Sequence, residues 1–376
     1  MASFAVLRHC ISGFRYAGYA RYSITEATDC STTDRARSAP AAAEPCCVWQ
    51  GGDMKAVIVP EPGDASALTI AEVEKPYPAP GEVLVRTTAV GVNRADVLQR
   101  QGHYPPPKGV TDVLGLEASG VVEAVAEGCE RWNVGDEVVA LLAGGGAAEY
   151  FVAPEGQLIS PPPGVDLVSA AGVLEVAATV VSNLEHTHLK EGETFLVHGG
   201  AGGIGTFATQ YAKALGARVA ATAGTEAKLE HCRQHGTDIA LDYHDDWVAA
   251  LKEATDGHGA DVILDIIGAK YLEANVKALA RRGRMVVIGL QGGVKGTLNV
   301  GLLLSKQGTV TATSLRFRPE AEKAEICAQV ERKVWPLMRS GKVKLSPETR
   351  IPFDEVRRAH ELLESGDNVG KIVLEL

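Results

Sequence analysis

Hydrophobic residues follow two different patterns along the chain. Between about residues 54 and 178, short segments alternate apolar and polar positions, and turns rich in proline and glycine separate them. From residue 195 onward, continuous apolar runs alternate with segments of helical periodicity. Alternation is typical of strands with one buried face, whereas strands buried on both faces are apolar throughout. The sequence therefore predicts a β-rich domain followed by an α/β domain with a parallel sheet.

The expected elements follow from these runs. In the β-rich part, strands are predicted at 55–59, 68–73, 82–90, 120–126, 137–141 and 148–152. Proline and glycine between them are typical of a partly open β-barrel. A further β run at 371–376 is expected to return to this domain. In the α/β part, strands are predicted at 195–198, 217–223, 239–243, 261–267, 284–290 and 309–315, with helices at 206–215, 226–235, 270–281 and from 320.

A glycine cluster joins the strand that begins at Phe195 to the helix that follows. Gly200, Gly202 and Gly205 form the pattern G-x-G-x-x-G. The first glycine permits a tight turn, the second lets backbone N–H groups approach a pyrophosphate, and the third lets helix and strand pack closely. The positive end of the helix dipole then faces the phosphates. Because repeated strand–helix units flank the motif, we interpret it as a dinucleotide-binding Rossmann turn.

The end of the next strand indicates which dinucleotide binds. An NAD site usually has an acidic residue there to bind the ribose 2′-hydroxyl. This chain has Gly224 and Thr225 instead, with Lys228 one helical turn later. A small turn, a hydroxyl and a cation suit a 2′-phosphate, so NADPH is favoured over NADH. The alternative for Lys228 is an ordinary solvated lysine.

Composition limits the class of protein. The 376 residues are 45% hydrophobic and 22% charged, with a formal net charge of −10. We therefore expect no binding to nucleic acid or to a membrane surface. No apolar run approaches the roughly 18 residues of a membrane span. Seven scattered cysteines indicate a reducing compartment, and the cytoplasm is expected.

The chain divides into three regions. Residues 1–53 are rich in Ala, Ser, Thr and Arg and are expected to form a tail; a start assigned too early is favoured over a mitochondrial presequence. Residues 54–178 are assigned to the β-rich domain, to which 318–376 return. Residues 179–317 are assigned to the Rossmann domain.

Several motifs resemble those of the zinc-independent quinone oxidoreductases of the medium-chain dehydrogenase/reductase superfamily. The resemblance is to the zeta-crystallin-like branch that includes the tumour-suppressor-inducible quinone oxidoreductase, and it covers 54–376. The motifs that carry it are 92–107 (VNRADVLQRQGHYPPP), 114–120, 134–138, 140–146, the glycine loop, 222–225 and 370–373. The resemblance implies a GroES-like β-barrel domain and a homodimer. Leu174 departs from the family, which usually has proline there.

The resemblance also implies that no metal is present. Zinc-containing members of the superfamily have Cys where this chain has Asn93, and His where it has Leu116. Asp96 and Glu117 remain, but two carboxylates do not make a tetrahedral zinc set. His186 and His188 are interpreted as solvated residues at a helix end.

The family's site maps onto individual positions. Asn93, Asp96 and Tyr104 match the polar residues near the nicotinamide and the substrate, although Asn93 and Asp96 could merely cap a turn and Tyr104 could merely pack. The matching cofactor positions, beyond the three motif glycines and Gly224, Thr225 and Lys228, are Thr179, Gly203, Ile204, Tyr243, Ile267, Gly289, Leu290, Ser314 and Arg316.

The expected reaction is transfer of a hydride from NADPH to a quinone or a similar electron-poor acceptor. Tyr104 and Asn93 are the candidates for hydrogen bonding or relaying a proton to the developing oxyanion. Two alternatives remain: a 2-alkenal or enoyl reductase, in which Tyr104 protonates Cα, and a non-catalytic NADPH-binding protein. The strand at 308–315 is β-branched and uncharged, so an edge-paired homodimer is expected.

Overall fold

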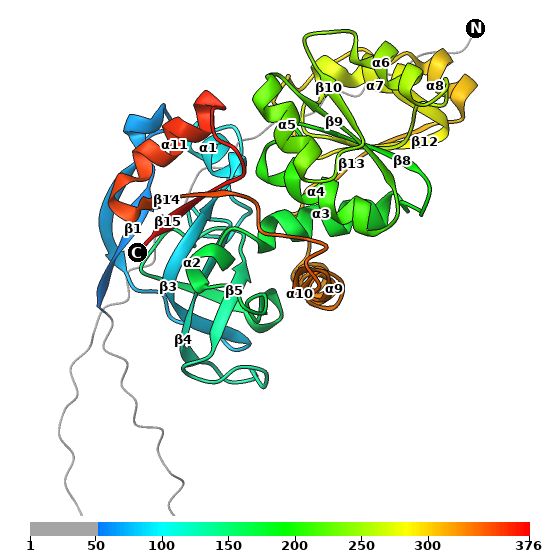
Figure 1. Ribbon diagram of the computed structural model, residues 1–376. Helices are drawn as coiled ribbons and strands as arrows, with labels where there is room; N and C mark the ends of the chain where they lie inside the picture. Colours follow the sequence, from blue (N-terminus) through cyan, green and yellow to red (C-terminus); the bar gives the residue numbers. More distant parts are fainter. Residues whose placement is uncertain (1–51) are drawn as a thin grey trace, which may run out of the picture. The chain divides into compact units, whose positions relative to one another are not determined.

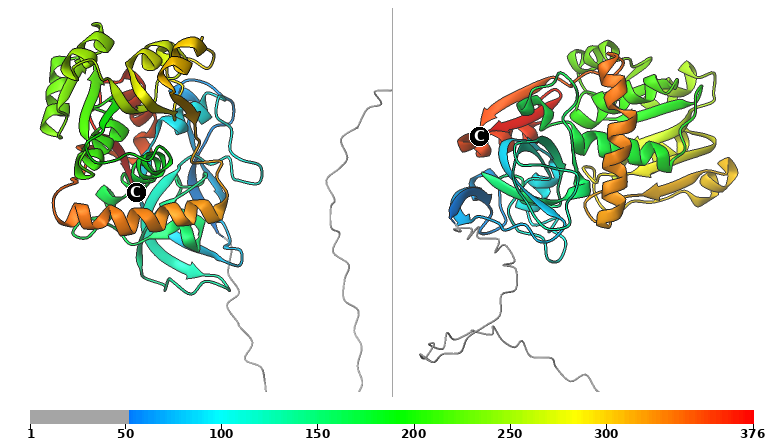
Figure 2. Two further views of the ribbon diagram at one scale, coloured as in Figure 1. Left: turned by 90° about the vertical axis from the view of Figure 1, so that its right-hand side faces the viewer. Right: turned by 90° about the horizontal axis from the view of Figure 1, so that it is seen from below.

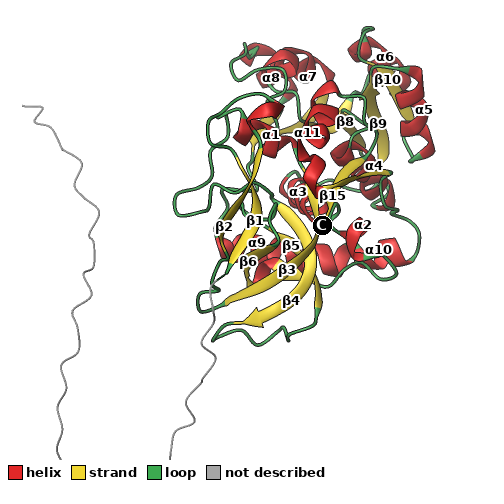
Figure 3. Ribbon diagram, turned by 90° about the vertical axis from the view of Figure 1, so that its left-hand side faces the viewer, coloured by secondary structure: helices red, strands yellow, loops and turns green. Residues whose placement is uncertain are grey.

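The computed structural model describes residues 52–376, which lie within one compact unit. The predictions for the tail fall almost entirely outside these residues. Two large sheets and the helices around them form the described fold (Figures 1 and 3). The predicted class, a doubly wound Rossmann sheet with a GroES-like β domain, is confirmed.

The β-rich sheet has seven strands in the order β14-β15-β3-β4-β5-β7, and β6 also pairs with β3. A separate antiparallel hairpin of β1 and β2 packs beside it. Inward-facing residues of β3 to β6 form a core that includes Val85, Val122 and Phe151. The strands are β1 (Asp53–Ile58), β2 (Thr69–Glu74), β3 (Glu82–Val92), β4 (Glu117–Val125), β5 (Glu137–Leu141), β6 (Tyr150–Pro154), β7 (Leu158–Ile159), β14 (Glu348–Pro352) and β15 (Lys371–Glu375).

The second sheet has six parallel strands in the order β10-β9-β8-β11-β12-β13, the Rossmann order expected from the sequence. Its strands are β8 (Thr194–His198), β9 (Arg218–Ala223), β10 (Ile239–Asp242), β11 (Ala260–Asp265), β12 (Leu279–Val287) and β13 (Thr309–Ala312). The helices associated with it are α3 (Leu174–His186), α4 (Gly203–Ala214), α5 (Glu226–Gln234), α6 (Trp247–Ala254), α7 (Leu272–Ala278) and α8 (Val300–Lys306).

Some predicted boundaries are wrong. The helix expected at 270–281 ends at Ala278, and the chain enters β12 directly. Leu279 already has an extended backbone, with φ −55° and ψ 140°, so the helix cannot continue through it. The last parallel strand ends at Ala312, and the Thr313 hydroxyl that follows donates a hydrogen bond to Asn183 Oδ1 at 2.6 Å. No helix was predicted at α1 (Arg94–Arg100), α2 (Leu167–Ala170), α6, α8 or α11 (Val356–Ser365), and only the end of α3, at His186, was expected.

The segment from α2 through α3 corrects the statement that no apolar run approaches the length of a membrane span. Residues 167–186 have a mean hydropathy of 1.7 over the most apolar window, 78% of which is buried inside the protein. The cores of both sheets cover it: Ala177 and Val181 belong to one buried cluster with Val139 of β5 and Val197 of β8. We therefore interpret this segment as a core helix.

Two later segments join the sheets. Helix α9 (Glu320–Lys333), orange in Figure 2, contacts both α3 and β7 and is followed by α10 (Trp335–Arg339). After α11 (Val356–Ser365), the chain pairs β15 with β3. Just before β15, the Gly370 N–H donates to the carbonyl of Ala201 in the glycine loop, at 3.0 Å. The start of β15 therefore lies against the dinucleotide-binding motif.

Candidate functional site

The glycine loop has the geometry that its motif predicts. A Cβ on Gly205 would lie 2.3 Å from the carbonyl oxygen of Gly199, and one on Gly200 would lie 2.7 Å from Cys232 Sγ. Close packing therefore requires glycine at both positions. Gly202 precedes the first turn of α4, where unpaired N–H groups and the helix dipole favour an anion. These residues fit a dinucleotide pyrophosphate.

The end of β9 forms a second part of the same surface. A Cβ on Gly224 would lie 2.2 Å from the ring of Tyr243, so only glycine lets that tyrosine pack over the turn. The Thr225 hydroxyl caps α5 by accepting from the N–H of Lys228 at 3.3 Å. Lys228 Nζ donates to the carbonyl of Gly366 at 2.5 Å, so this lysine reaches across to the segment after α11. A small turn and a partly exposed cation fit the predicted 2′-phosphate site.

A buried polar cluster lies beside the glycine loop. Lys371 Nζ is 2.6 Å from Asn93 Oδ1 and 2.6 Å from Glu117 Oε1. The Asn93 amide nitrogen donates to Glu117 Oε1 at 3.1 Å and to the Gly91 carbonyl at 3.2 Å. Both amide hydrogens of Asn93 are therefore engaged inside the protein. Asn93 holds the cluster together, and it must break these bonds to donate to a substrate.

Two further carboxyl groups border this cluster. Asp96 accepts from the N–H groups of Asn93 and Gly115, at 2.8 and 3.1 Å. Burial raises the pKa of Asp96 to about 6, although these hydrogen bonds oppose the rise. Asp96 thus caps the start of α1, which is the structural alternative considered for it.

Glu175, at the start of α3, is the third acid. Its backbone N–H donates to Glu117 Oε2 at 2.9 Å, and its carboxyl accepts from the Thr179 hydroxyl at 3.2 Å. Burial raises the pKa of Glu175 to about 7, and Lys371 partly opposes this. Glu117 adds repulsion that favours the protonated form. The structure therefore brings the predicted residue Thr179 next to an acid that titrates near neutrality.

Tyr104 lies in the loop after α1 and faces the segment after β13. Its hydroxyl is 3.0 Å from Ser314 Oγ. Arg316 is 4% exposed and donates to the carbonyls of Tyr104 and Ala143, at 3.1 and 2.7 Å. A third bond from Arg316 reaches Gln99 Oε1 at 2.7 Å. Arg316 therefore fixes the Tyr104 loop, and its proposed contact with the cofactor stays a prediction.

The remaining predicted cofactor residues follow the carboxyl ends of β8, β10, β11 and β12. Ile267 N–H donates to Asp265 Oδ1 at 2.7 Å, and a Cβ on Gly289 would lie 2.7 Å from the Ile266 carbonyl oxygen. Leu290 is 50% exposed, and the ring of Tyr243 is 45% exposed. Ile204 lies in the first turn of α4. These side chains gather at the carboxyl edge of the sheet, where ligands of doubly wound folds bind.

The polar cluster does not fit a zinc ion. At the positions of the superfamily's zinc ligands, the chain places an amide, Asn93, and an apolar residue, Leu116. The ammonium of Lys371 lies between the Asn93 and Glu117 oxygens. Zinc requires sulfur, imidazole or carboxylate donors, and a cation already balances this carboxylate. His186, one of the two histidines considered at the helix end, has its Nε2 3.2 Å from the Thr311 hydroxyl oxygen.

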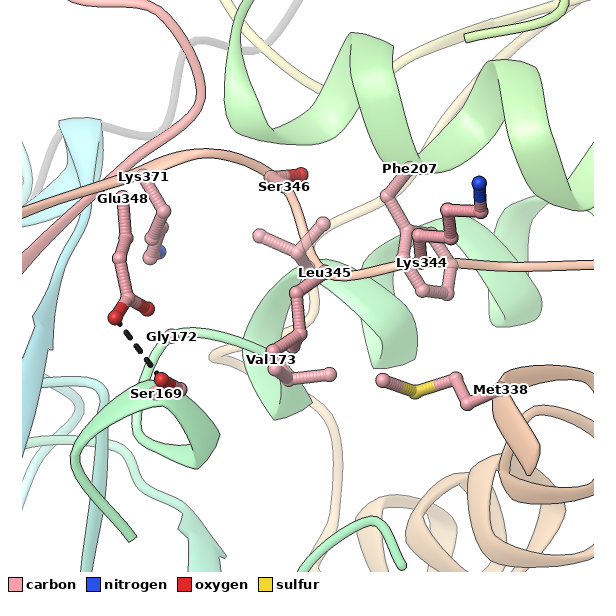
Figure 4. Close-up of a pocket in the computed structure, with 11 residues that line it drawn as sticks. Ser169, Gly172, Val173, Phe207, Met338, Lys344, Leu345, Ser346, Glu348 and Lys371 are labelled. Carbon is pink, nitrogen blue, oxygen red and sulfur yellow. Dashed lines mark hydrogen bonds between the residues drawn. The ribbon is translucent and has the colours of Figure 1, made fainter. Parts of the chain in front are cut away.

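A small cavity adjoins Lys371 on the side of α10 (Figure 4). It measures about 20 Å³ and lies between Val173, Phe207, Met338 and Leu345. At the end nearer Lys371, Ser169 donates to Glu348 at 2.9 Å. Ligand pockets are usually about 300–1,000 Å³, so this cavity is too small for a nicotinamide or a quinone.

Sequence reasoning missed Lys371 and Glu175 as site residues and treated Glu117 only as part of an incomplete zinc set. A signal was present, because each charge interrupts an apolar segment: KIVL at 371–374, LEVAA at 174–178 and LEAS at 116–119. A charged residue within a buried run needs a partner. The pattern therefore indicates buried charge, although it does not say which residues pair.

Comparison with known proteins agrees with this architecture. Residues 79–163 match the family described as "Alcohol dehydrogenase GroES-like domain", and residues 203–329 match "Zinc-binding dehydrogenase". The chain is 34% identical to a quinone oxidoreductase of Pseudomonas aeruginosa over 83% of this chain and 96% of that protein. It is 32% identical to quinone oxidoreductase 1 of Escherichia coli over the same shares.

A solved structure gives the same result. The quinone oxidoreductase of Escherichia coli complexed with NADPH aligns with a TM-score of 0.76 and 30% identity, over 86% of this chain and 100% of that one. The Rossmann order, the glycine loop and the relatives agree on one family. The chain therefore belongs to the quinone oxidoreductases of the medium-chain dehydrogenase/reductase superfamily, and it is an oxidoreductase.

Proposed function

We propose that the protein transfers a hydride from NADPH to a quinone or a similar electron-poor acceptor without using a metal. The observation that carries this proposal is the Lys371 ammonium between Asn93 and Glu117, in place of metal ligands. When bound, NADPH supplies the hydride. The glycine loop would bind its pyrophosphate, and Thr225 and Lys228 its 2′-phosphate.

A quinone is a strong electrophile, so its reduction requires alignment more than activation. Tyr104 and Ser314 would face the acceptor, and Arg316 fixes the Tyr104 loop against Ala143 and Gln99. Phe317 packs edge-on against the Tyr104 ring, with centroids 5.4 Å apart. Ser314, which contacts the Tyr104 hydroxyl, and Phe317, which contacts its ring, both lie in the segment after β13.

Steady-state NADPH oxidation with 1,4-benzoquinone and with a 2-alkenal tests the proposal. We expect turnover with the quinone at the higher kcat/KM. Turnover with the alkenal alone would replace the proposed function with the reductase alternative. That second candidate has support from Glu175, a carboxyl that titrates near neutrality, because C=C reduction requires a proton at Cα.

Catalysis without a metal can be tested separately. Protein purified without added metal is expected to contain no stoichiometric zinc and to keep its activity in strong chelator, because no tetrahedral donor set surrounds the cluster. Elemental analysis and an activity assay with and without chelator measure this. One tightly bound zinc ion per subunit would contradict it.

A homodimer through the edge of the parallel sheet is also part of the proposal. The strand β13 is at the end of the sheet order and contains no charged residue or proline. Such an edge can pair with its copy about a two-fold axis. Within the described residues, β12 is the one strand that pairs with β13, so the other edge of β13 has no strand partner.

Introducing Thr311→Lys together with Ala312→Pro is expected to convert the dimer into a monomer, because the lysine charges the edge and the proline removes a hydrogen-bond donor. Light scattering at micromolar concentration measures the mass of wild type and variant, and NADPH binding serves as the control for folding. A wild-type mass of one chain would contradict the edge-paired dimer.

A further inference from the structure

Proton delivery requires a group that the predicted candidates do not readily provide. Asn93 has both amide hydrogens bound to Gly91 and Glu117. The Tyr104 hydroxyl is bound to Ser314, and burial raises the pKa of this phenol above its usual value. Both groups serve better to position than to give up a proton.

Glu175 differs from the other two acids in its access to solvent. Asp96 is 3% exposed and Glu117 is 0% exposed, whereas Glu175 is partly exposed. Among residues 52–376, Thr179 is the single group that hydrogen-bonds the Glu175 carboxyl, and it binds Oε1. Oε2 is therefore available to carry a proton.

Glu175 also lies where the reaction would occur. Its neighbour Val176 would be 3.7 Å from a Cβ on Gly203, and the Lys371 side chain would be 3.6 Å from the same point. The charge of Glu175 also raises the pKa of Tyr104, so the acid and the phenol share one region. Both observations place the acid near the glycine loop and near Tyr104.

The charges around Glu175 favour its protonated form. Lys371 from β15 forms a 2.6 Å ion pair with Glu117 from β4, so the single nearby ammonium is already paired. The charge of Asp96 from α1 also raises the pKa of Glu175. The guanidinium of Arg316 lowers the pKa values of Asp96 and Tyr104 instead. Ionising Glu175 places a further negative charge beside Glu117 and Asp96, which is unfavourable.

We infer that Glu175 is the general acid of the proposed reaction and gives its Oε2 proton to the reduced acceptor. This inference rests on the proposed function. After the acceptor gains a hydride, it carries two more electrons, one more hydrogen and one negative charge. The Glu175 O–H bond breaks and Glu175 is left as a carboxylate. The proton forms a new O–H bond on a quinone oxygen, or a new C–H bond on the Cα of an alkenal. Water then returns the proton.

The test compares Glu175→Gln with wild type over a range of pH. A general acid contributes roughly 10²–10⁴-fold, so kcat with a 2-alkenal is expected to fall by at least about 100-fold. Because the protonated acid is the active form, wild-type activity is expected to fall as pH rises through about 7, and the variant is expected to lose this dependence. The loss with 1,4-benzoquinone is expected to be smaller, since its reduced anion is a weaker base.

The matched control is Glu185→Gln on the same helix, an exposed residue paired with Lys333 at 2.7 Å. It is expected to keep the wild-type rate and pH profile. A readout independent of turnover is the infrared band of a protonated carboxyl in the cofactor-free protein. The component of this band that titrates near pH 7 should be missing from Glu175→Gln, whereas the component from Asp96, which titrates near pH 6, should remain.

The outcomes separate the two claims. A Glu175→Gln variant with wild-type kcat and pH profile, or one that keeps the whole carboxyl band of the wild type, would overturn the assignment and leave the proposed function intact. A wild type that oxidises NADPH with neither acceptor would overturn the proposed function, and this assignment with it.

Discussion

Replacing Lys371 with methionine is expected to lower the free energy of unfolding by about 3–5 kcal/mol, the usual cost of leaving one partner of a buried ion pair alone. Lys371 is 7% exposed and Glu117 is 0% exposed. Without the ammonium, the Glu117 carboxylate keeps only the Asn93 amide and the Glu175 N–H as partners. Chemical denaturation followed by circular dichroism measures the loss.

Two further variants make this prediction specific. Lys333→Met removes an exposed ammonium paired with Glu185, and is expected to cost less than about 1 kcal/mol. Combining Lys371→Met with Glu117→Gln removes both charges and should recover much of the stability, as a double-mutant cycle would show. A single Lys371→Met variant within about 1 kcal/mol of wild type would refute the buried pair as a stabilising unit.

Replacing Lys228 with alanine is expected to weaken NADPH binding by about 1–3 kcal/mol, or roughly 5- to 150-fold, and to leave NADH binding nearly unchanged. The reason is that the ammonium would contact the 2′-phosphate, which NADH lacks. In the structure this ammonium donates to the Gly366 carbonyl at 2.5 Å, so it lies on the surface beside the turn at Gly224. Fluorescence titration with each cofactor measures the difference.

Arg233→Ala is the matched control for Lys228→Ala, because it removes an exposed cation from the same helix. Its guanidinium binds Glu226 and Glu230, at 2.6 and 3.1 Å. It is expected to leave both affinities unchanged. Equal losses of NADPH and NADH affinity in Lys228→Ala would contradict the 2′-phosphate assignment.

The parallel sheet could be predicted because its signals are local. Each of its strands is an apolar run, and the motif at Gly200–Gly205 gives the topology of the first strand–helix unit. The boundaries of β12 and β13 could not, since the extended backbone at Leu279 and the length over which β13 pairs with β12 are set by tertiary contacts. Such features are tertiary and leave little trace in periodicity.

The cofactor surface was also predictable, because glycine, threonine and lysine at 224–228 have a local chemical meaning. The polar cluster was not, because Asn93, Glu117, Glu175 and Lys371 come from four separated segments. Their pairing is decided by strand register: β15 pairs Ile372 with Val92, one residue before Asn93. No local pattern in the sequence reveals this long-range register.

The position of β15 has a consequence for how the chain folds as it is made. Lys371 comes 278 residues after Asn93, and the whole parallel sheet lies between them. At roughly 5–20 residues per second, the ribosome takes about 15–55 s to span that distance. Throughout this interval residues 89–92 of β3 lack their partner strand β15, and Glu117 lacks the Lys371 ammonium. The parallel sheet therefore has time to fold first, and closure of the β domain is a late, long-range step of the kind that slows folding.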